Sequence, residues 1–135
     1  MPAKKTDVPQ FFRLNVEVGN LEEAVKFYSE LLGIEGRKQA GARAYYQCGP
    51  VNLSVLDVSS VAEPHPVPKS MYFTVADLEA VFDRAKLLGA LSRELVHGAK
   101  GGAMVVRPWG ERSFYVDDPW GNQLCFVEEG TVYAG

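Results

Sequence analysis

Residues 12–33 read FRLNVEVGNLEEAVKFYSELLG, and residues 71–89, MYFTVADLEAVFDRAKLLG, repeat the same pattern. Each stretch begins with apolar residues at every second position and continues with apolar residues at helical spacing. This change of period predicts a strand that leads directly into a helix. Asn20 and Asp77 stand where each helix should begin, as N-cap residues, and a glycine follows each helical run. The chain is therefore predicted to contain an internal repeat, with one strand–helix unit in each half.

Short strand-like runs follow each helix and complete the repeat. Glycine-containing turns separate them, and the segment 118–122, DPWGN, is a strong turn signal. Three prolines in the segment 62–69 indicate an extended linker between the halves. The expected runs are 44–48 and 51–58 in the first half, and 91–96, 104–107, 113–116 and 123–127 in the second. We therefore predict an α+β fold of two tandem βαβββ modules.

Composition favours one ordinary core and limits the partners. The 135 residues are 47% hydrophobic and 23% charged, with a net charge of -3 and no long run of either sign. Such a chain gives no electrostatic reason to expect binding to nucleic acid or to a membrane. No apolar stretch reaches the roughly 20 residues that span a bilayer, and the N-terminus lacks the apolar core of a secretory signal. We expect a cytoplasmic protein in which Cys48 and Cys125 are free thiols.

Strand alternation predicts that one face of the sheets is polar. A solvated outer face would explain this pattern equally well. However, amide and hydroxyl side chains outnumber Lys and Glu on it, which favours a cleft or an interface. The residues assigned to this face are Arg13, Asn15, Glu17, Asn52, Ser54, Ser70, Tyr72, Thr74, Gln123 and Cys125.

Two groups of motifs resemble a known superfamily. The first half contains VGNL at 18–21, and the second contains FYVDDPWGNQLCFVE at 114–128. With the repeat, these motifs resemble the vicinal oxygen chelate superfamily of glyoxalase I, extradiol dioxygenases, fosfomycin resistance enzymes and bleomycin resistance proteins. The resemblance implies mixed sheets curving around a cleft, helices on the outer face, and a homodimer. It covers a single domain, 11–128, with module one at about 11–61, a linker at about 62–69, module two at about 70–128, and tails at 1–10 and 129–135.

The metal ligands of that superfamily have no counterpart here. The resemblance places the four ligand positions on Arg13, Ser54, Ser70 and Cys125, and none of these is His, Asp or Glu. Two hydroxyls, one thiol and one guanidinium suit a divalent ion poorly. His65 lies in the linker and His97 in a Gly-rich loop, away from those positions. We therefore expect no metal and no cofactor.

Four further residues are candidates for catalysis or ligand binding, and each also has a structural explanation. Glu17 could act as a base or form an ion pair with Arg13, and Cys125 could be a nucleophile or a buried inert thiol. Trp109 could stack on a planar ligand whose carboxylate is held by Arg112. Alternatively, Trp109 covers the core edge and Arg112 pairs with a carboxylate such as Asp117.

The leading hypothesis is a metal-free protein that holds a planar, partly polar small molecule in its cleft. Its expected ligand-binding residues are Arg13, Asn15, Ser54, Ser70, Tyr72, Trp109, Arg112 and Cys125. The alternative is an enzyme of the same fold, either a metal-free lyase or isomerase with Glu17 or Cys125 as a weak catalytic candidate, or a metal-dependent glyoxalase or dioxygenase.

Overall fold

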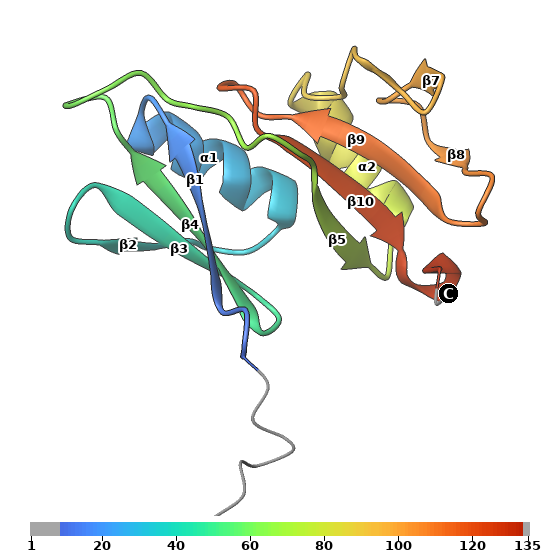
Figure 1. Cartoon of the computed structure of the whole chain (residues 1–135), viewed down its shortest axis with the longest axis horizontal. Helices are drawn as coiled ribbons and strands as arrows, with labels where there is room; N and C mark the ends of the chain where they lie inside the picture. Colours follow the sequence, from blue (N-terminus) through green and yellow to red (C-terminus); the bar gives the residue numbers. More distant parts are fainter. Residues whose placement is uncertain (1–8, 134–135) are drawn as a thin grey trace, which may run out of the picture.

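The computed structural model describes residues 9–133 and contains two four-stranded sheets side by side, each with one helix against it (Figure 1). We name the sheets A and B. In sheet A the strand order is β1-β4-β3-β2, and in sheet B it is β5-β10-β9-β8. The first module consists of β1 (Arg13–Val18), α1 (Leu21–Leu32), β2 (Arg37–Gln39), β3 (Arg43–Cys48) and β4 (Val51–Asp57). The second consists of β5 (Met71–Val75), α2 (Leu78–Leu87), β6 (Leu95–Val96), β7 (Ala99–Lys100), β8 (Val105–Val106), β9 (Arg112–Asp117) and β10 (Gln123–Glu128), and the short helix η1 (Glu129–Thr131) follows.

Both sheets are mixed, and their topology confirms the predicted pair of βαβββ modules. The first strand of each module runs parallel to the last, β1 beside β4 and β5 beside β10. The remaining neighbours are antiparallel. The first strands also form one edge of each sheet, so β1 and β5 each pair on one side only.

The helices begin where the cap residues predict. The Asn20 side chain accepts a hydrogen bond from the backbone N–H of Glu23 at 2.9 Å, and Asp77 accepts one from Ala80 at 3.0 Å. Gly33 ends α1 in the left-handed conformation, with φ at 71°, which glycine adopts without steric penalty. Local sequence therefore determines where each strand–helix unit turns.

The turn between β9 and β10 joins the two modules. Tyr28 on α1 donates a 2.7 Å hydrogen bond to Asp118, and both side chains are buried. Asn122 donates from its side chain to the backbone oxygen of Glu17 and accepts from the backbone N–H of Val67. These bonds connect the first module, the linker and the second module, and one apolar core continues through both halves.

The segment between α2 and β9 is less regular than predicted. Instead of strands at 91–96 and 104–107, it forms a two-stranded hairpin, β6–β7, and a two-residue β8. Leu91 forms only an isolated bridge to Val116. Among the described residues, no helix is long and apolar enough to cross a membrane.

Candidate functional site

The register of sheet A sets polar side chains in rows across one face. Leu14, Val16, Leu53 and Val55 lie on the other face and pack against the core. Because paired residues share a face, the polar side chains form a grid, which we call the sheet A face. Its rows are Arg13–Asn52–Gln47, then Asn15–Ser54–Tyr45–Arg37, then Glu17–Leu56–Arg43–Gln39. The predicted grouping of Arg13, Asn15, Glu17, Asn52 and Ser54 is thus confirmed, and β2 and β3 add residues that sequence reasoning missed.

Tyr45 is the centre of a cationic cluster on this face. The Arg13 guanidinium lies over the Tyr45 ring at 5.3 Å and over the Phe12 ring at 5.0 Å. Arg43 approaches the Tyr45 hydroxyl at 3.5 Å and donates to the backbone oxygen of Ala40. No ion pair within residues 9–133 involves Arg13, Arg43 or Arg37. The cluster therefore presents positive charge beside an aromatic ring with no carboxylate to neutralise it.

Glu17 is the one acidic residue of the grid, and it is engaged elsewhere. Its carboxylate accepts a 2.9 Å hydrogen bond from the backbone N–H of His65, whose ring nitrogen Nδ1 is 3.7 Å away. The sequence suggested Arg13 as its partner, and the structure instead places Glu17 against the linker. Among residues 9–133, Arg13 is therefore left without a counter-ion.

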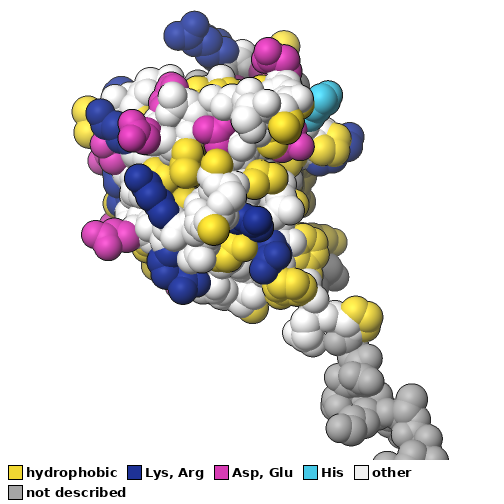
Figure 2. Space-filling view, turned by 90° about the vertical axis from the view of Figure 1, so that its left-hand side faces the viewer, with side chains coloured by type: hydrophobic (Ala, Val, Ile, Leu, Met, Phe, Trp, Pro, Cys, Tyr) yellow, Lys and Arg dark blue, Asp and Glu magenta, His cyan; other side chains and the backbone are white. Residues whose placement is uncertain are grey.

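Figure 2 views the molecule from the side of sheet A. Lysine and arginine side chains lie among hydrophobic ones on this side, together with several acidic side chains. Within the grid itself, Arg13, Arg43 and Arg37 are arranged around Tyr45. Such a surface suits a planar ligand that carries negative charge.

The equivalent face of sheet B is largely closed. Its central row is Tyr72–Cys125–Tyr115. Cys125 and Tyr115 are buried, whereas Tyr72 is 59% exposed and shares a 2.9 Å hydrogen bond with the Tyr115 hydroxyl. Burial is the main cause that raises the pKa of the Cys125 thiol to about 11. At neutral pH the thiol is protonated, which favours the inert reading of Cys125 over the nucleophilic one.

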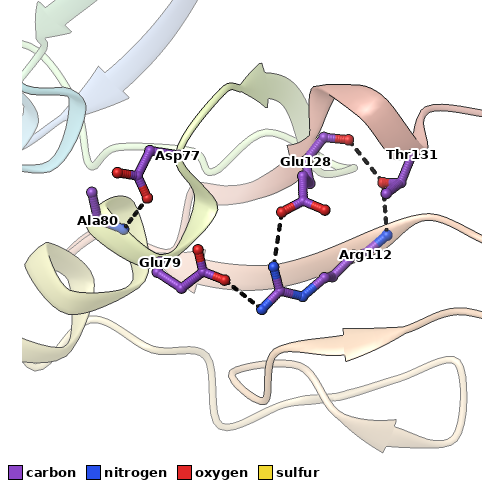
Figure 3. A network of polar contacts seen from close by, with 6 residues as sticks. All are labelled: Asp77, Glu79, Ala80, Arg112, Glu128 and Thr131. Atoms are coloured by element: carbon purple, nitrogen blue, oxygen red, sulfur yellow. Dashed lines mark hydrogen bonds and ion pairs between the residues drawn. The ribbon is translucent and has the colours of Figure 1, made fainter.

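Trp109 and Arg112 do not converge on one ligand site. The Trp109 ring packs edge-on against His97 at 4.8 Å, on the Tyr115 side of sheet B, and its Nε1 donates to Glu111. Arg112 alternates with Ser113 along β9 and points to the other side. There its guanidinium bonds Glu79 of α2 at 2.7 Å and Glu128 of β10 at 2.8 Å (Figure 3).

The partners of Arg112 differ from the suggested one, Asp117. Asp117 instead accepts a hydrogen bond from the Gln123 side chain at 3.2 Å. The backbone N–H of Arg112 also donates to Thr131, so the residue ties α2, β9, β10 and η1 together (Figure 3). Arg112 therefore has a structural role that occupies its guanidinium.

The residues at the superfamily's metal positions do not fit a metal ion. Arg13 carries positive charge, Ser54 is 1% exposed, and Ser70 donates its hydroxyl proton to Gln123. The thiol of Cys125 is protonated at neutral pH, so it is a poor ligand. Within residues 9–133, no three His, Cys, Asp or Glu side chains lie close enough together to hold an ion.

A separate groove of about 820 Å³ lies between the modules. It is mostly apolar, and its lining includes core-face residues of both first strands, the end of α1 and the middle of α2. Leu14, Leu32, Ile34, Tyr72, Phe73 and Arg84 are among them. Sequence reasoning missed it, because a groove between two modules depends on how they pack.

Comparison with known proteins agrees with this architecture. The sequence profile of the Glyoxalase/Bleomycin resistance protein/Dioxygenase superfamily matches residues 10–126. No curated protein matches the chain.

Several solved structures share the fold. A glyoxalase/bleomycin resistance protein from Albidiferax ferrireducens T118 superimposes with a TM-score of 0.72 at 20% identity, covering 87% of this chain and 97% of its own. Oxidase ChaP-H1 gives 0.73 at 19% identity, with 95% and 100% covered. A glyoxalase-related enzyme from Fulvimarina pelagi gives 0.70 at 20% identity, with 90% and 88% covered. At these identities the likeness establishes the fold alone.

Proposed function

Because the chain belongs to the Glyoxalase/Bleomycin resistance protein/Dioxygenase superfamily, we propose that it binds a planar, anionic small molecule on the sheet A face without a metal ion. The observation that carries the proposal is the cluster at Tyr45. Arg13 lies over the Tyr45 ring and Arg43 approaches its hydroxyl, and neither arginine is paired with a carboxylate in the described part of the chain. A bound anion would supply the missing counter-charge.

The chemistry of the face defines the ligand class. The Tyr45 ring offers a surface for stacking, and guanidinium groups bind carboxylate or phosphate through directed hydrogen bonds. Asn15 lies in the same row as Tyr45 and is exposed, so it adds a neutral hydrogen-bonding group, whereas Ser54 between them is buried. A hydrogen bond to a charged group contributes about 1.5–3 kcal/mol, so loss of one arginine should weaken binding about 10- to 100-fold.

Three ligands of matched shape test this proposal. Benzoate, benzamide and benzamidine share a flat ring and differ in charge, and their dissociation constants can be measured by NMR titration. We expect benzoate to bind at least about tenfold more tightly than benzamide, and benzamidine not to bind. Arg13→Gln and Arg43→Gln should each remove most of the preference for benzoate. Arg93→Gln is the control, because Arg93 is an exposed arginine of the second module.

The outcomes distinguish a wrong charge preference from a wrong binding site. If benzamide binds as tightly as benzoate at the Tyr45 resonances, ligand binding stands and the charge preference is wrong. If none of the three shifts those resonances, and a wider panel of aromatic acids does not either, the proposed function is wrong.

A metal-free enzyme of the same fold is the second candidate, and the placement of Glu17 favours it. The carboxylate lies in the same row as Arg43, and its side chain is 37% exposed, so it can reach a ligand on this face. A carboxylate beside a bound substrate can accept a proton from it. Glu17→Gln should then abolish turnover while leaving the NMR-detected affinity unchanged, and retained turnover would exclude Glu17 as the base.

The proposal includes a homodimer in the cytoplasm. The free edges of β1 and β5 support it, because an exposed strand edge favours pairing with another chain. The apolar groove between the modules adds a surface that a second copy can cover, with Phe11 and Tyr72 exposed beside it.

A further inference from the structure

Arg107 is a buried cation that has no counter-ion in the described part of the chain. It follows β8, and only 4% of the residue is exposed. Its Nε donates a 3.0 Å hydrogen bond to Ser113, and its guanidinium carbon lies 5.2 Å from the centroid of the Tyr115 ring. Its Nη2 atom is buried and has no hydrogen-bond partner in the structure.

No carboxylate within residues 9–133 is paired with this guanidinium. Glu111 shares its turn, but the Glu111 carboxylate accepts hydrogen bonds from the Trp109 side chain and the backbone of Tyr133. Removing a charge from water is strongly unfavourable unless an opposite charge compensates for it. Contact with the Tyr115 ring offsets only part of that cost.

The hairpin β6–β7 lies over this part of sheet B. Val96 packs against Tyr115 and its buried neighbours, and the His97 ring lies 6.5 Å from the Tyr115 ring. The base of the hairpin is bonded to β9, since Tyr115 donates to Gly101 and accepts from Ser92. Within residues 9–133, the tip of the hairpin, His97 and Gly98, forms no backbone hydrogen bond to β9.

The tip is a two-residue turn in which both residues have positive φ. His97 has a φ of 51°, in the left-handed region, which is unfavourable for a residue with a side chain. Gly98 follows with a φ of 78°. Movement of this tip would break no backbone hydrogen bond to β9 and would leave the pairing between β9 and β10 intact.

We infer that Arg107 is the anion-binding residue of a second site, enclosed beneath the tip of the hairpin β6–β7, which takes a small oxyanion such as a carboxylate or phosphate group. The unpaired Nη2 donates to the anion, and Tyr115 and His97 form the walls. This site lies on the second module and is independent of the sheet A face.

Thermal unfolding tests the inference with inorganic phosphate and acetate as probes, at an ionic strength held constant with sodium chloride. The midpoint of the wild-type protein should rise by about 4 °C at an anion concentration ten times the dissociation constant. In the Arg13→Gln background, where the sheet A face is disabled, Arg107→Met should abolish the response. Without anion, Arg107→Met should be at least as stable as wild type, because it lacks the unpaired charge. Arg93→Met, at an exposed arginine, should respond like wild type.

Two measurements keep the result decisive. Trp109 contacts His97, so its fluorescence in the wild-type protein should change on phosphate titration even if Arg107→Met folds poorly. The response should survive Arg13→Gln, which would disable the sheet A face and leave this site intact. An Arg13→Gln midpoint that ignores both anions, or a response that persists in Arg13→Gln/Arg107→Met, would overturn the inference.

Discussion

Replacing Tyr28 by Phe should weaken the connection between the two modules. The Tyr28 hydroxyl donates to Oδ2 of Asp118 at 2.7 Å, and the two residues are 90 positions apart in the chain. The substitution keeps the ring, which packs against Phe27 and Tyr46, and removes only the donor. Asp118 retains bonds from the backbone of Trp120 and from Asn122, but its buried carboxylate loses one partner.

A hydrogen bond to a charged group contributes about 1.5–3 kcal/mol, so the free energy of unfolding should fall by about this amount. Burial, reinforced by Asp118, raises the pKa of the Tyr28 hydroxyl well above its ordinary value, so the hydroxyl remains a donor at neutral pH. Urea denaturation followed by circular dichroism measures the change, and the slope of the transition should stay constant. Tyr133→Phe is the matched control, since Tyr133 is 61% exposed. A loss below about 0.5 kcal/mol, typical of a surface substitution, would refute the view that this bond joins the modules.

Two further predictions concern the buried thiol and the groove. Burial raises the pKa of Cys125 from 9.0 to about 11, so between these pH values the unfolded chain loses its proton while the folded chain keeps it. The free energy of unfolding should therefore fall with rising pH across this window, by up to about 1.4 kcal/mol per pH unit. Urea titrations should show a shallower fall for Cys125→Ala. If the free energy falls equally steeply with pH in both proteins, the assigned pKa is contradicted. Ile34→Glu, in the lining of the groove, should shift the light-scattering mass from dimer to monomer. Val61→Glu, at an exposed residue just before the linker, should not, and an unchanged mass for Ile34→Glu would remove the groove from the interface.

The fold was predictable because local signals agree with one another. Alternation in 12–18 and 71–75, followed by helical spacing and a cap residue, specifies each strand–helix unit without tertiary information. The polar faces of β1 and β4 were predictable for the same reason. The alternation of Arg43, Tyr45 and Gln47 in β3 follows the same rule, so it could have revealed the rest of the sheet A face.

The partners of individual side chains were not predictable, because they depend on packing between distant elements. Arg112 was expected to bind a ligand or Asp117, yet it bonds Glu79 and Glu128 on two other elements. The segment 118–122 was correctly predicted as a turn, but its role in joining the modules requires Tyr28, which lies 90 positions before Asp118. A single sequence contains no signal for such pairs.

Each module places an arginine over a tyrosine ring, but this pair is open to solvent in the first module and enclosed in the second. The difference supports separate roles for the two sheet faces. Tyr45 pairs with Ser54 across sheet A as Tyr115 pairs with Cys125 across sheet B, and an arginine lies over each tyrosine ring. In the first module that arginine comes from the edge strand β1, and the cluster stays open to solvent. In the second it comes from the segment after β8, and the hairpin encloses it. An open cationic face can exchange a ligand freely, whereas an enclosed cation binds only after the hairpin tip moves, so a ligand that reaches both sites should bind the first face faster than the second.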